Sequence, residues 1–188
     1  DDRFCPVFLR NATAYGASPA MRFDLVLNNL SGHAWTTREI KMTSDGTPWR
    51  PLVHIADISK AFAMALEAPA DAVRNQVRNV GDTRENYRVR EIATLVGEAF
   101  PGCRVSFGSG DTDTRSYRVR FERIRKILPG YACDYTAARG ARELQELFSR
   151  IHMTRETFEH RAFTRMKQLE HLCRRGRIDG DFFWKSAA

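Results

Sequence analysis

The 188-residue sequence has no uninterrupted apolar run of roughly eighteen residues, the length that a membrane-spanning helix requires. Its four cysteines (Cys5, Cys103, Cys133 and Cys173) are scattered and lack the short spacings of a metal site. They are typical of reduced, mostly buried thiols, so we expect a cytoplasmic protein. Residues 1–3 read Asp-Asp-Arg, whereas a secretory signal would begin with a basic segment.

The sequence also lacks a lysine-rich tail and any helix-turn-helix, zinc-finger or RNA-recognition signature. It is nevertheless basic, with 30 Lys and Arg against 23 Asp and Glu and a pI near 9.6. Such a charge attracts nucleic acid, anionic lipid or an anionic small molecule. The arginines are spread along the chain, with modest clusters at 115–125 and 174–177. We therefore expect a small anionic ligand and keep nucleic-acid binding as the alternative.

No recognisable catalytic motif is present. A dinucleotide-binding turn needs closely spaced glycines after a strand, and the only close pair, Gly108 and Gly110, precedes no long helix. No tyrosine has a lysine four residues later, the arrangement that lowers a phenol pKa for proton transfer. His-Glu-x-x-His and Gly-x-Ser-x-Gly are also missing. We therefore assign no catalytic residue and no metal ligand.

Apolar residues make up 43% of the chain and aromatic residues 11%, which indicates a globular fold. Short apolar runs alternate with segments of helical periodicity, so the pattern predicts an α/β protein with a purely helical C-terminal third. The expected strands are 4–10, 39–42, 52–55, 75–81 and 104–107. The expected helices are 23–34, 58–66, 89–100, 117–128, 136–151 and 154–173, the last with a possible break near Ala162.

The most informative stretch is residues 45–57, Asp-Gly-Thr-Pro-Trp-Arg-Pro-Leu-Val-His-Ile-Ala-Asp. It predicts a tight turn, then Arg50, then a buried strand, and then Asp57 as the cap of the following helix. A guanidinium held at the lip of a strand suits a phosphate, because its planar fork of donors can bind two oxygens. The alternative from spacing alone is a surface turn with a solvated arginine.

The pattern Asp-Gly-x-x-x-Arg-x-x-x-His-x-x-Asp in this stretch resembles a hallmark of the extended short-chain dehydrogenase/reductase family that acts on nucleotide sugars. The resemblance implies that Arg50 binds the diphosphate of a sugar nucleotide. It also implies that His54 and Asp57 support the junction between the strand and its helix.

Residues 9–16, Leu-Arg-Asn-Ala-Thr-Ala-Tyr-Gly, resemble the strand that follows the Tyr-x-x-x-Lys helix of the same family. By that resemblance Asn11, Ala12 and Thr13 line the nicotinamide and sugar side of the cleft. The cofactor of the intact family enzyme is NAD or NADP, although this chain lacks the turn that would bind it.

Two further stretches resemble substrate-contacting segments of the family. Residues 21–28 correspond to the segment that contacts the nucleotide sugar, with Arg22, Phe23 and Asn28 as candidates. Residues 113–119 resemble a subgroup motif ahead of a short helix. There Arg115 is the candidate for a second phosphate or ribose contact.

Tyr117, in the same motif as Arg115, completes the set of candidate substrate-binding residues. The resemblance as a whole implies edge strands of a Rossmann-type sheet within 1–20 and 50–81, followed by a mostly helical substrate-binding part in 82–188. The N-terminal dinucleotide-binding half is absent from the sequence, so 1–188 corresponds to the substrate-binding C-terminal portion. The expected partners are a nucleotide diphosphate sugar and either an N-terminal cofactor-binding half or a second copy of the chain.

The predicted function is therefore that of a nucleotide-sugar epimerase or dehydratase, which transiently transfers a hydride to its cofactor. Three alternatives stay open: a catalytically inactive sugar-nucleotide-binding module, one chain of a split enzyme, and a basic nucleic-acid-binding protein.

Overall fold

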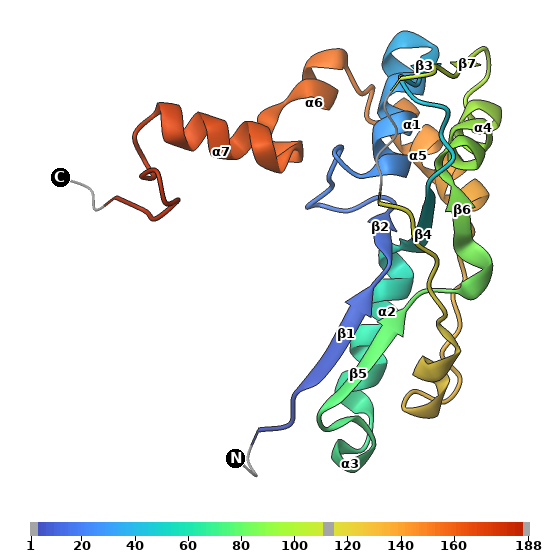
Figure 1. The fold of residues 1–188 in the computed structure, drawn as a ribbon, viewed down its shortest axis with the longest axis vertical. Coiled ribbons are helices and arrows are strands. Elements are labelled where there is room, and N and C mark those ends of the chain that lie inside the picture. The colour runs from blue at the N-terminus through green and yellow to red at the C-terminus, as the bar shows by residue number, and fades with distance from the viewer. Residues whose placement is uncertain (1–3, 111–114, 186–188) are drawn as a thin grey trace.

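Figure 1 shows the computed structural model of the chain, which describes residues 4–110 and 115–185. The fold is mixed α/β, as predicted. The strands are β1 (Val7–Asn11), β2 (Thr13–Tyr15), β3 (Glu39–Lys41), β4 (Trp49–His54), β5 (Gln76–Val80), β6 (Asn86–Arg88) and β7 (Arg104–Ser106). The α-helices are α1 (Val26–Thr37), α2 (Ile55–Glu67), α3 (Ala70–Val73), α4 (Val89–Ala99), α5 (Ala137–Arg150), α6 (Arg155–Glu159) and α7 (Arg165–Arg174). Short 3₁₀ helices are η1 (Thr83–Glu85), η2 (Glu122–Lys126) and η3 (Arg161–Phe163).

The strands that carry the candidate residues are mostly parallel. β1 pairs with β5 and β2 pairs with β4, both in parallel register, and β6 adds to β4 antiparallel. Only Ala12 separates β1 from β2, and its N–H donates to the Val80 carbonyl at 3.0 Å. The chain thus changes strand partner at Ala12, which places Asn11 beside the end of β5 and Thr13 beside β4.

Helix α2 follows β4 directly and packs against β1, β2 and β4. Its buried positions Ile58, Ala61 and Ala65 recur every three or four residues, so they form one face of the helix. Together with strand and η2 side chains this face makes one of two apolar clusters. The other buried members of the cluster are Val53, Val73, Val80, Ile124, Ile127, Leu128 and Tyr131.

The second apolar cluster lies among helices α1, α4 and α5, which stand together in the upper part of the molecule (Figure 1). Each helix contributes apolar side chains at helical spacing, so each buries one stripe against the other two. The fully buried side chains from these helices include Leu27, Ala34, Ile92, Val96, Leu144 and Phe148.

The predicted C-terminal helix is broken near Ala162, as expected. α6 ends at Glu159, η3 follows, and α7 begins only at Arg165. Figure 1 shows α7 extending away from the body of the molecule, and no residue of α7 is buried. We call residues 161–185 the C-terminal arm. No helix in the described residues is long and apolar enough to cross a membrane.

The helix predicted for residues 117–128 is wrong. Residues 115–121 have no regular structure, and only η2 follows. The reason is that the backbone donors of this segment are bonded elsewhere: Val119 N–H donates to the Asn86 side chain at 2.8 Å, and Phe121 N–H donates to the Thr83 hydroxyl at 3.1 Å. The motif at 113–119 falls partly on residues 111–114, which lie outside the described residues.

The prediction that Asp57 caps its helix is also wrong. Helix α2 begins at Ile55, and the cap is His54, whose Nδ1 accepts from Ala56 N–H at 3.2 Å. Asp57 lies in the first turn, buried, and its carboxylate accepts from the backbone N–H groups of Asp134 (2.8 Å) and Tyr135 (3.2 Å). It therefore connects α2 to the loop before α5.

Candidate functional site

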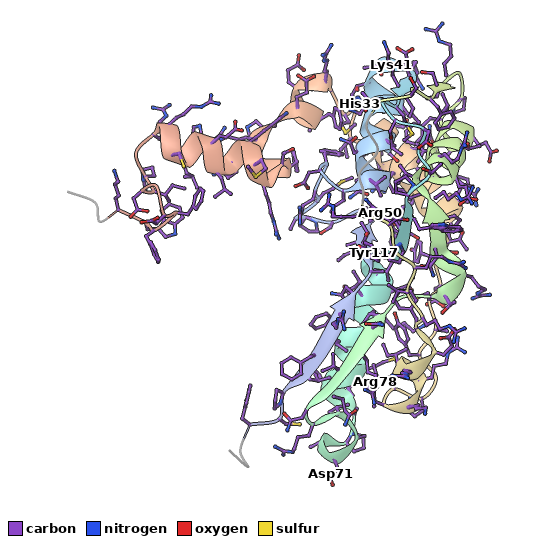
Figure 2. All side chains as sticks on the ribbon, viewed as in Figure 1. His33, Lys41, Arg50, Asp71, Arg78 and Tyr117 are labelled. Carbon is purple, nitrogen blue, oxygen red and sulfur yellow. The ribbon has the colours of Figure 1, made fainter. Side chains whose placement is uncertain are left out.

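The structure brings together three of the predicted substrate-binding residues. Arg50 lies in β4, and its guanidinium Nη1 donates to the carbonyl of Trp49 at 2.8 Å and to the carbonyl of Arg115. The same guanidinium carbon lies 5.7 Å from the centre of the Tyr117 ring. Figure 2 labels Arg50 and Tyr117 close together near the middle of the molecule. Because Arg115 is 65 residues from Arg50, this grouping depends on the tertiary fold.

Tyr117 also lines a cavity of about 210 Å³ at the ends of β1 and β5. Two of the predicted cofactor-side residues, Asn11 and Ala12, line the same cavity, and Pro51, next to Arg50, forms part of its wall. Thr13 is half-buried in β2, one residue beyond Ala12. The other lining residues, which sequence reasoning did not select, are Arg10, Asn79, Val119 and Phe121.

Arg22 lies away from this cavity, in the loop before α1. Its Nε and Nη2 donate to the two carboxylate oxygens of Asp24, both at 2.8 Å. This bidentate pair raises the pKa of Arg22, mainly through the hydrogen bonds, and lowers the pKa of Asp24 for the same reason. The contact of Arg22 with a ligand stays a prediction.

Phe23 and Asn28 are buried beside the same loop. The Phe23 ring packs edge-on against Phe158 and Phe163, with ring centres 4.9 and 5.4 Å away. The Asn28 amide oxygen accepts from Gly16 N–H at 3.1 Å, and its amide nitrogen donates to the Arg22 carbonyl at 3.0 Å. Both side chains support the loop between β2 and α1, and their roles as ligand contacts also stay predictions.

A polar cluster that the sequence did not reveal lies at the end of β4. The buried His54 ring has its Nε2 2.6 Å from the Glu143 carboxylate and stacks on the Tyr135 ring at 3.7 Å. Tyr15 meets the same ring edge-on at 5.1 Å. These contacts connect β4 to α5 across 89 residues of sequence. No local pattern could have identified Glu143 as the partner.

Glu85 is a second buried carboxylate near the same helix. Its Oε2 accepts from Ala137 N–H at 2.8 Å, at the start of α5, and from the Tyr87 hydroxyl at 3.1 Å. Burial raises the pKa of Glu85, although the two hydrogen bonds partly oppose the shift. Burial also raises the pKa of the Tyr87 hydroxyl. In both groups burial thus favours the protonated form over the charged form.

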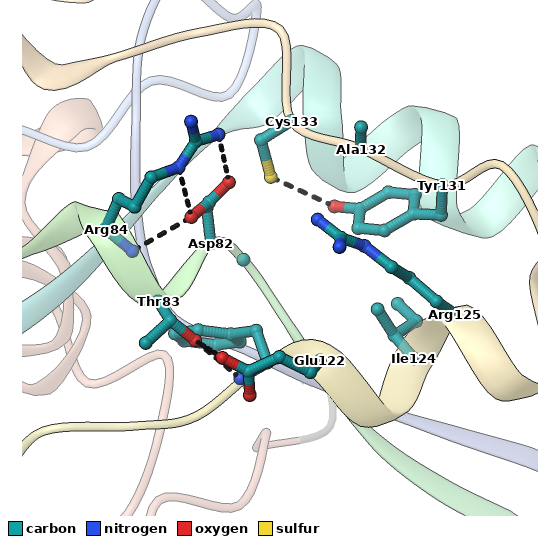
Figure 3. A pocket seen from close by; sticks show the side chains of 11 residues that line it. Asp82, Thr83, Arg84, Glu122, Ile124, Arg125, Tyr131, Ala132 and Cys133 are labelled. Atoms are coloured by element: carbon teal, nitrogen blue, oxygen red, sulfur yellow. Dashed lines mark hydrogen bonds and ion pairs between the residues drawn. The ribbon is translucent and has the colours of Figure 1, made fainter.

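Figure 3 shows a second cavity, of about 280 Å³, and Phe121 lines both this cavity and the first one. Asp82 caps η1 there and pairs with Arg84 at 2.7 Å, which lowers the pKa of Asp82. The Cys133 thiol lies 3.4 Å from the Tyr131 hydroxyl, and burial raises the pKa of Cys133 to about 11. A thiol with such a pKa is a weak nucleophile at neutral pH.

The lining of this second cavity carries charges of both signs. Figure 3 shows Arg125 reaching across it toward Asp82 and Tyr131, while Glu122 accepts from the Thr83 hydroxyl at 2.7 Å. Within residues 4–110 and 115–185, no group of three or more His, Cys, Asp or Glu residues could hold a metal ion. We assign no chemistry to this cavity.

Comparison with known proteins relates part of the chain to one family and its fold to several solved structures. Residues 1–81 match the family model described as the NAD dependent epimerase/dehydratase family. An epimerase from Methanothermobacter thermautotrophicus has a similar structure, with a TM-score of 0.68 and 16% identity over 79% of this chain and 44% of that protein.

Two further similar structures contain ligands. A UDP-glucose 4-epimerase from Thermotoga maritima with UDP-glucose has a TM-score of 0.63 and 20% identity, over 77% of this chain and 46% of that protein. MoeE5 in complex with UDP-glucose and NAD has a TM-score of 0.58 and 25% identity, over 77% of this chain and 47% of that protein. The predicted family resemblance and Rossmann-type fold are confirmed, and the chain spans about half the length of these structures.

Proposed function

Because residues 1–81 match the model of the NAD-dependent epimerases and dehydratases, we propose that this chain is the sugar-nucleotide-binding part of such an enzyme. The observation that carries the proposal is the arrangement around Arg50. Its guanidinium contacts the Arg115 backbone and the face of Tyr117, beside a cavity that Asn11 and Ala12 also line. The Arg50 guanidinium thus meets the segment 115–117, which carries a second arginine and an aromatic ring.

The proposed ligand contacts follow from the chemistry of these side chains. A diphosphate carries charge on several oxygens, and a guanidinium binds two of them at once through parallel hydrogen bonds. Arg50, with Arg115 beside it, would hold the diphosphate. The sugar would then extend toward Asn11 and Ala12 at the strand ends. Fixing one end of a ligand in this way positions the other end for reaction.

The cofactor of the proposed enzyme is NAD or NADP, which when bound accepts and returns a hydride. Asn11 and Ala12 fit its nicotinamide side, because both line the cavity, and Thr13 lies next to them in β2. The Gly-rich turn and the Tyr-x-x-x-Lys pair do not occur in the 188 residues. We therefore assign this chain a binding role and no proton-transfer step.

The test is calorimetric titration with UDP-glucose, the nucleotide sugar bound in two of the similar structures. Arg50→Ala should raise the dissociation constant roughly ten- to a hundredfold, since one charge-assisted hydrogen bond contributes about 1.5–3 kcal/mol. Arg142→Ala is the matched control, because Arg142 is an exposed arginine on α5 and lines neither cavity. Equal affinities of the two variants would remove Arg50 from the site.

Two additional measurements separate the remaining alternatives. Free UDP should compete with UDP-glucose if the diphosphate is the anchored group. Binding to bulk DNA that weakens steeply with salt, without saturable UDP-glucose binding, would instead favour the nucleic-acid alternative. Turnover of UDP-glucose with added NAD would exclude an inactive binding module.

A further inference from the structure

The C-terminal arm ends in three consecutive aromatic residues, Phe182, Phe183 and Trp184, which we call the aromatic tip. Their side chains are 61%, 71% and 69% exposed. On the same arm Met166 of α7 is 63% exposed. Large apolar side chains that cluster in water are unfavourable, and such patches mark interaction surfaces more often than isolated exposed residues do.

The aromatic tip is held by a formed turn. The Asp179 carboxylate accepts from the N–H groups of Asp181 and Phe183, both at 2.9 Å. Asp179 N–H donates in return to the Phe183 carbonyl at 3.0 Å. Ile178, which is buried, forms an antiparallel bridge with Trp184. The turn therefore buries Ile178 and leaves the three aromatic rings outside.

Phe182 has a positive φ of 65°, in the left-handed region that bulky residues rarely adopt. Such a conformation persists only where the surrounding contacts determine it, and it often marks a functional position. Lys185 N–H donates to the Arg177 carbonyl at 3.0 Å and closes the base of the turn. The exposure of the tip is thus a feature of the ordered turn.

The charge around the tip has one dominant sign. Residues 161–185 contain seven Lys or Arg against three Asp or Glu. One of the three acidic side chains, Asp179, is bonded within the turn. All seven basic side chains are exposed: Arg161, Arg165, Lys167, Arg174, Arg175, Arg177 and Lys185.

We propose that the aromatic tip and the basic side chains of the C-terminal arm bind the surface of an anionic lipid membrane. Tryptophan and phenylalanine insert at the boundary between headgroups and acyl chains, while basic side chains nearby are attracted to anionic headgroups. The arm extends away from the body of the molecule, so the tip can reach a flat surface (Figure 1). The proposal does not depend on the sugar-nucleotide site.

The arrangement of the aromatic residues favours a membrane over a nucleic acid. Proteins that bind single strands place aromatic side chains along a basic groove, where successive bases stack on them. Here the three aromatic residues are adjacent in sequence at the tip of one turn, between Ile178 and Lys185. A projecting apolar tip with basic flanks matches a lipid interface.

The test is co-sedimentation of the protein with vesicles of phosphatidylcholine alone and of phosphatidylcholine with phosphatidylglycerol. The protein should bind the anionic vesicles about tenfold or more tightly than the neutral ones, and salt should weaken the binding. The triple variant Phe182→Ser, Phe183→Ser and Trp184→Ser should lose about tenfold or more of that affinity. The control variant Phe62→Ser and Leu66→Ser, which removes exposed apolar side chains from α2, should bind as the original protein does.

Trp184 provides a second, direct measurement. Its fluorescence, obtained by subtracting the spectrum of the Trp184→Phe variant, should shift to the blue when anionic vesicles are added. Circular dichroism should show that the triple variant is folded.

Three outcomes would overturn the proposal. The first is equal vesicle binding by the triple variant and the original protein, and the second is no binding to anionic vesicles at low salt. The third is a Trp184 spectrum that already indicates a buried indole without lipid, together with a change of oligomeric state in the triple variant. That third result would assign the tip to a contact with a second protein surface. If the original protein bound DNA but no vesicles, and the triple variant lost the DNA binding, the aromatic tip would be assigned to nucleic acid.

Discussion

At the scale of single residues, Gly16 shows how the end of β2 is adapted to its neighbours. Its φ is 105°, and a Cβ atom at this position would lie 2.1 Å from Nε2 of His54. We predict that Gly16→Ala lowers the free energy of unfolding by about 2–4 kcal/mol, since overpacking costs roughly 1–3 kcal/mol and a positive φ costs about 1 kcal/mol more. Urea denaturation measures this difference.

The matched control for Gly16 is Gly130→Ala. Gly130 also has a positive φ, of 83°, but a Cβ there would meet no atom within 4 Å. This variant should lose only the backbone contribution, about 1 kcal/mol. If both variants lost the same free energy, the close approach of Gly16 to the His54 ring would play no part in stability.

Glu85 should make the free energy of unfolding depend on pH. Burial raises its pKa above the ordinary value of 4.5, so the folded state binds the proton more tightly than the unfolded chain does. The stability that this tighter proton binding contributes is fully present below the pKa of Glu85 in the unfolded chain. It is lost as the pH rises through the pKa of Glu85 in the folded protein. Glu85→Gln keeps an oxygen that can accept from Ala137 N–H and removes the titration. Its free energy of unfolding should therefore decline less between about pH 4 and about pH 7.

Urea denaturation at a series of pH values tests this expectation. Glu146→Gln is a suitable control, because Glu146 is an exposed carboxylate on α5. It should reproduce the pH dependence of the original protein. A Glu85→Gln curve that is parallel to both would show that Glu85 ionises as easily in the folded state as in the unfolded chain.

At the scale of elements, the sequence predicted those segments whose pattern is local. α4 was expected at 89–100 and lies at Val89–Ala99, because its apolar spacing is regular and Pro101-Gly102 ends it. The strands expected at 39–42 and 104–107 are also present, as β3 and β7, because their patterns too are local. β6 was missed: it has three residues, and it exists only because it pairs with β4, where Trp49 lies opposite Arg88, 39 positions later.

The segment 117–128 illustrates a different kind of failure. Its apolar positions Phe121, Ile124 and Leu128 recur every three or four residues, as in a helix, and all three are buried. The backbone is nevertheless not helical before η2, because side chains of Asn86 and Thr83 bind its N–H groups. A periodic pattern thus reports which side chains are buried, while long-range hydrogen bonds decide the backbone conformation.

The candidate site divides in the same way. The resemblance selected Arg50, Asn11, Ala12 and Tyr117 as candidates from the order of short motifs, and these residues lie around one cavity or at its edge, while their contact with a ligand stays a prediction. The residues that hold the surrounding elements in place were not predicted. Glu143, for example, lies 89 residues from His54, and only the packing of α5 against β4 brings the two side chains together.

At the scale of the whole molecule, the β1–β5 sheet is covered differently on its two faces. α2 packs on one face, where Val7 and Leu9 are partly buried. Phe8 and Val77 are register partners with side chains 51% and 48% exposed. Parallel sheets are normally covered on both faces. This exposed pair leaves the second face of the sheet uncovered within the described residues, and the expected N-terminal half or second copy of the chain stays a prediction.

The C-terminal arm contacts the body of the molecule mainly through Phe163, and the contribution of the arm to stability can be measured. Phe163 joins the arm to the body: its carbonyl accepts from Phe23 N–H at 2.8 Å, and the two rings pack edge-on at 5.4 Å. Beyond it, α7 buries no residue. Removing residues 165–188 should therefore change the free energy of unfolding of the body by less than about 1 kcal/mol.

Phe163→Ala, in the untruncated chain, should lower the same free energy by about 1–3 kcal/mol, because it removes a partly buried ring from the aromatic cluster around Phe23. Urea denaturation of both proteins provides the comparison. A truncation that costs as much as Phe163→Ala would mean that α7 stabilises the body. The smaller cost would mean that residues 165–185, the arm beyond Phe163, are free to act on a surface outside the molecule, because they contribute little to the stability of the body.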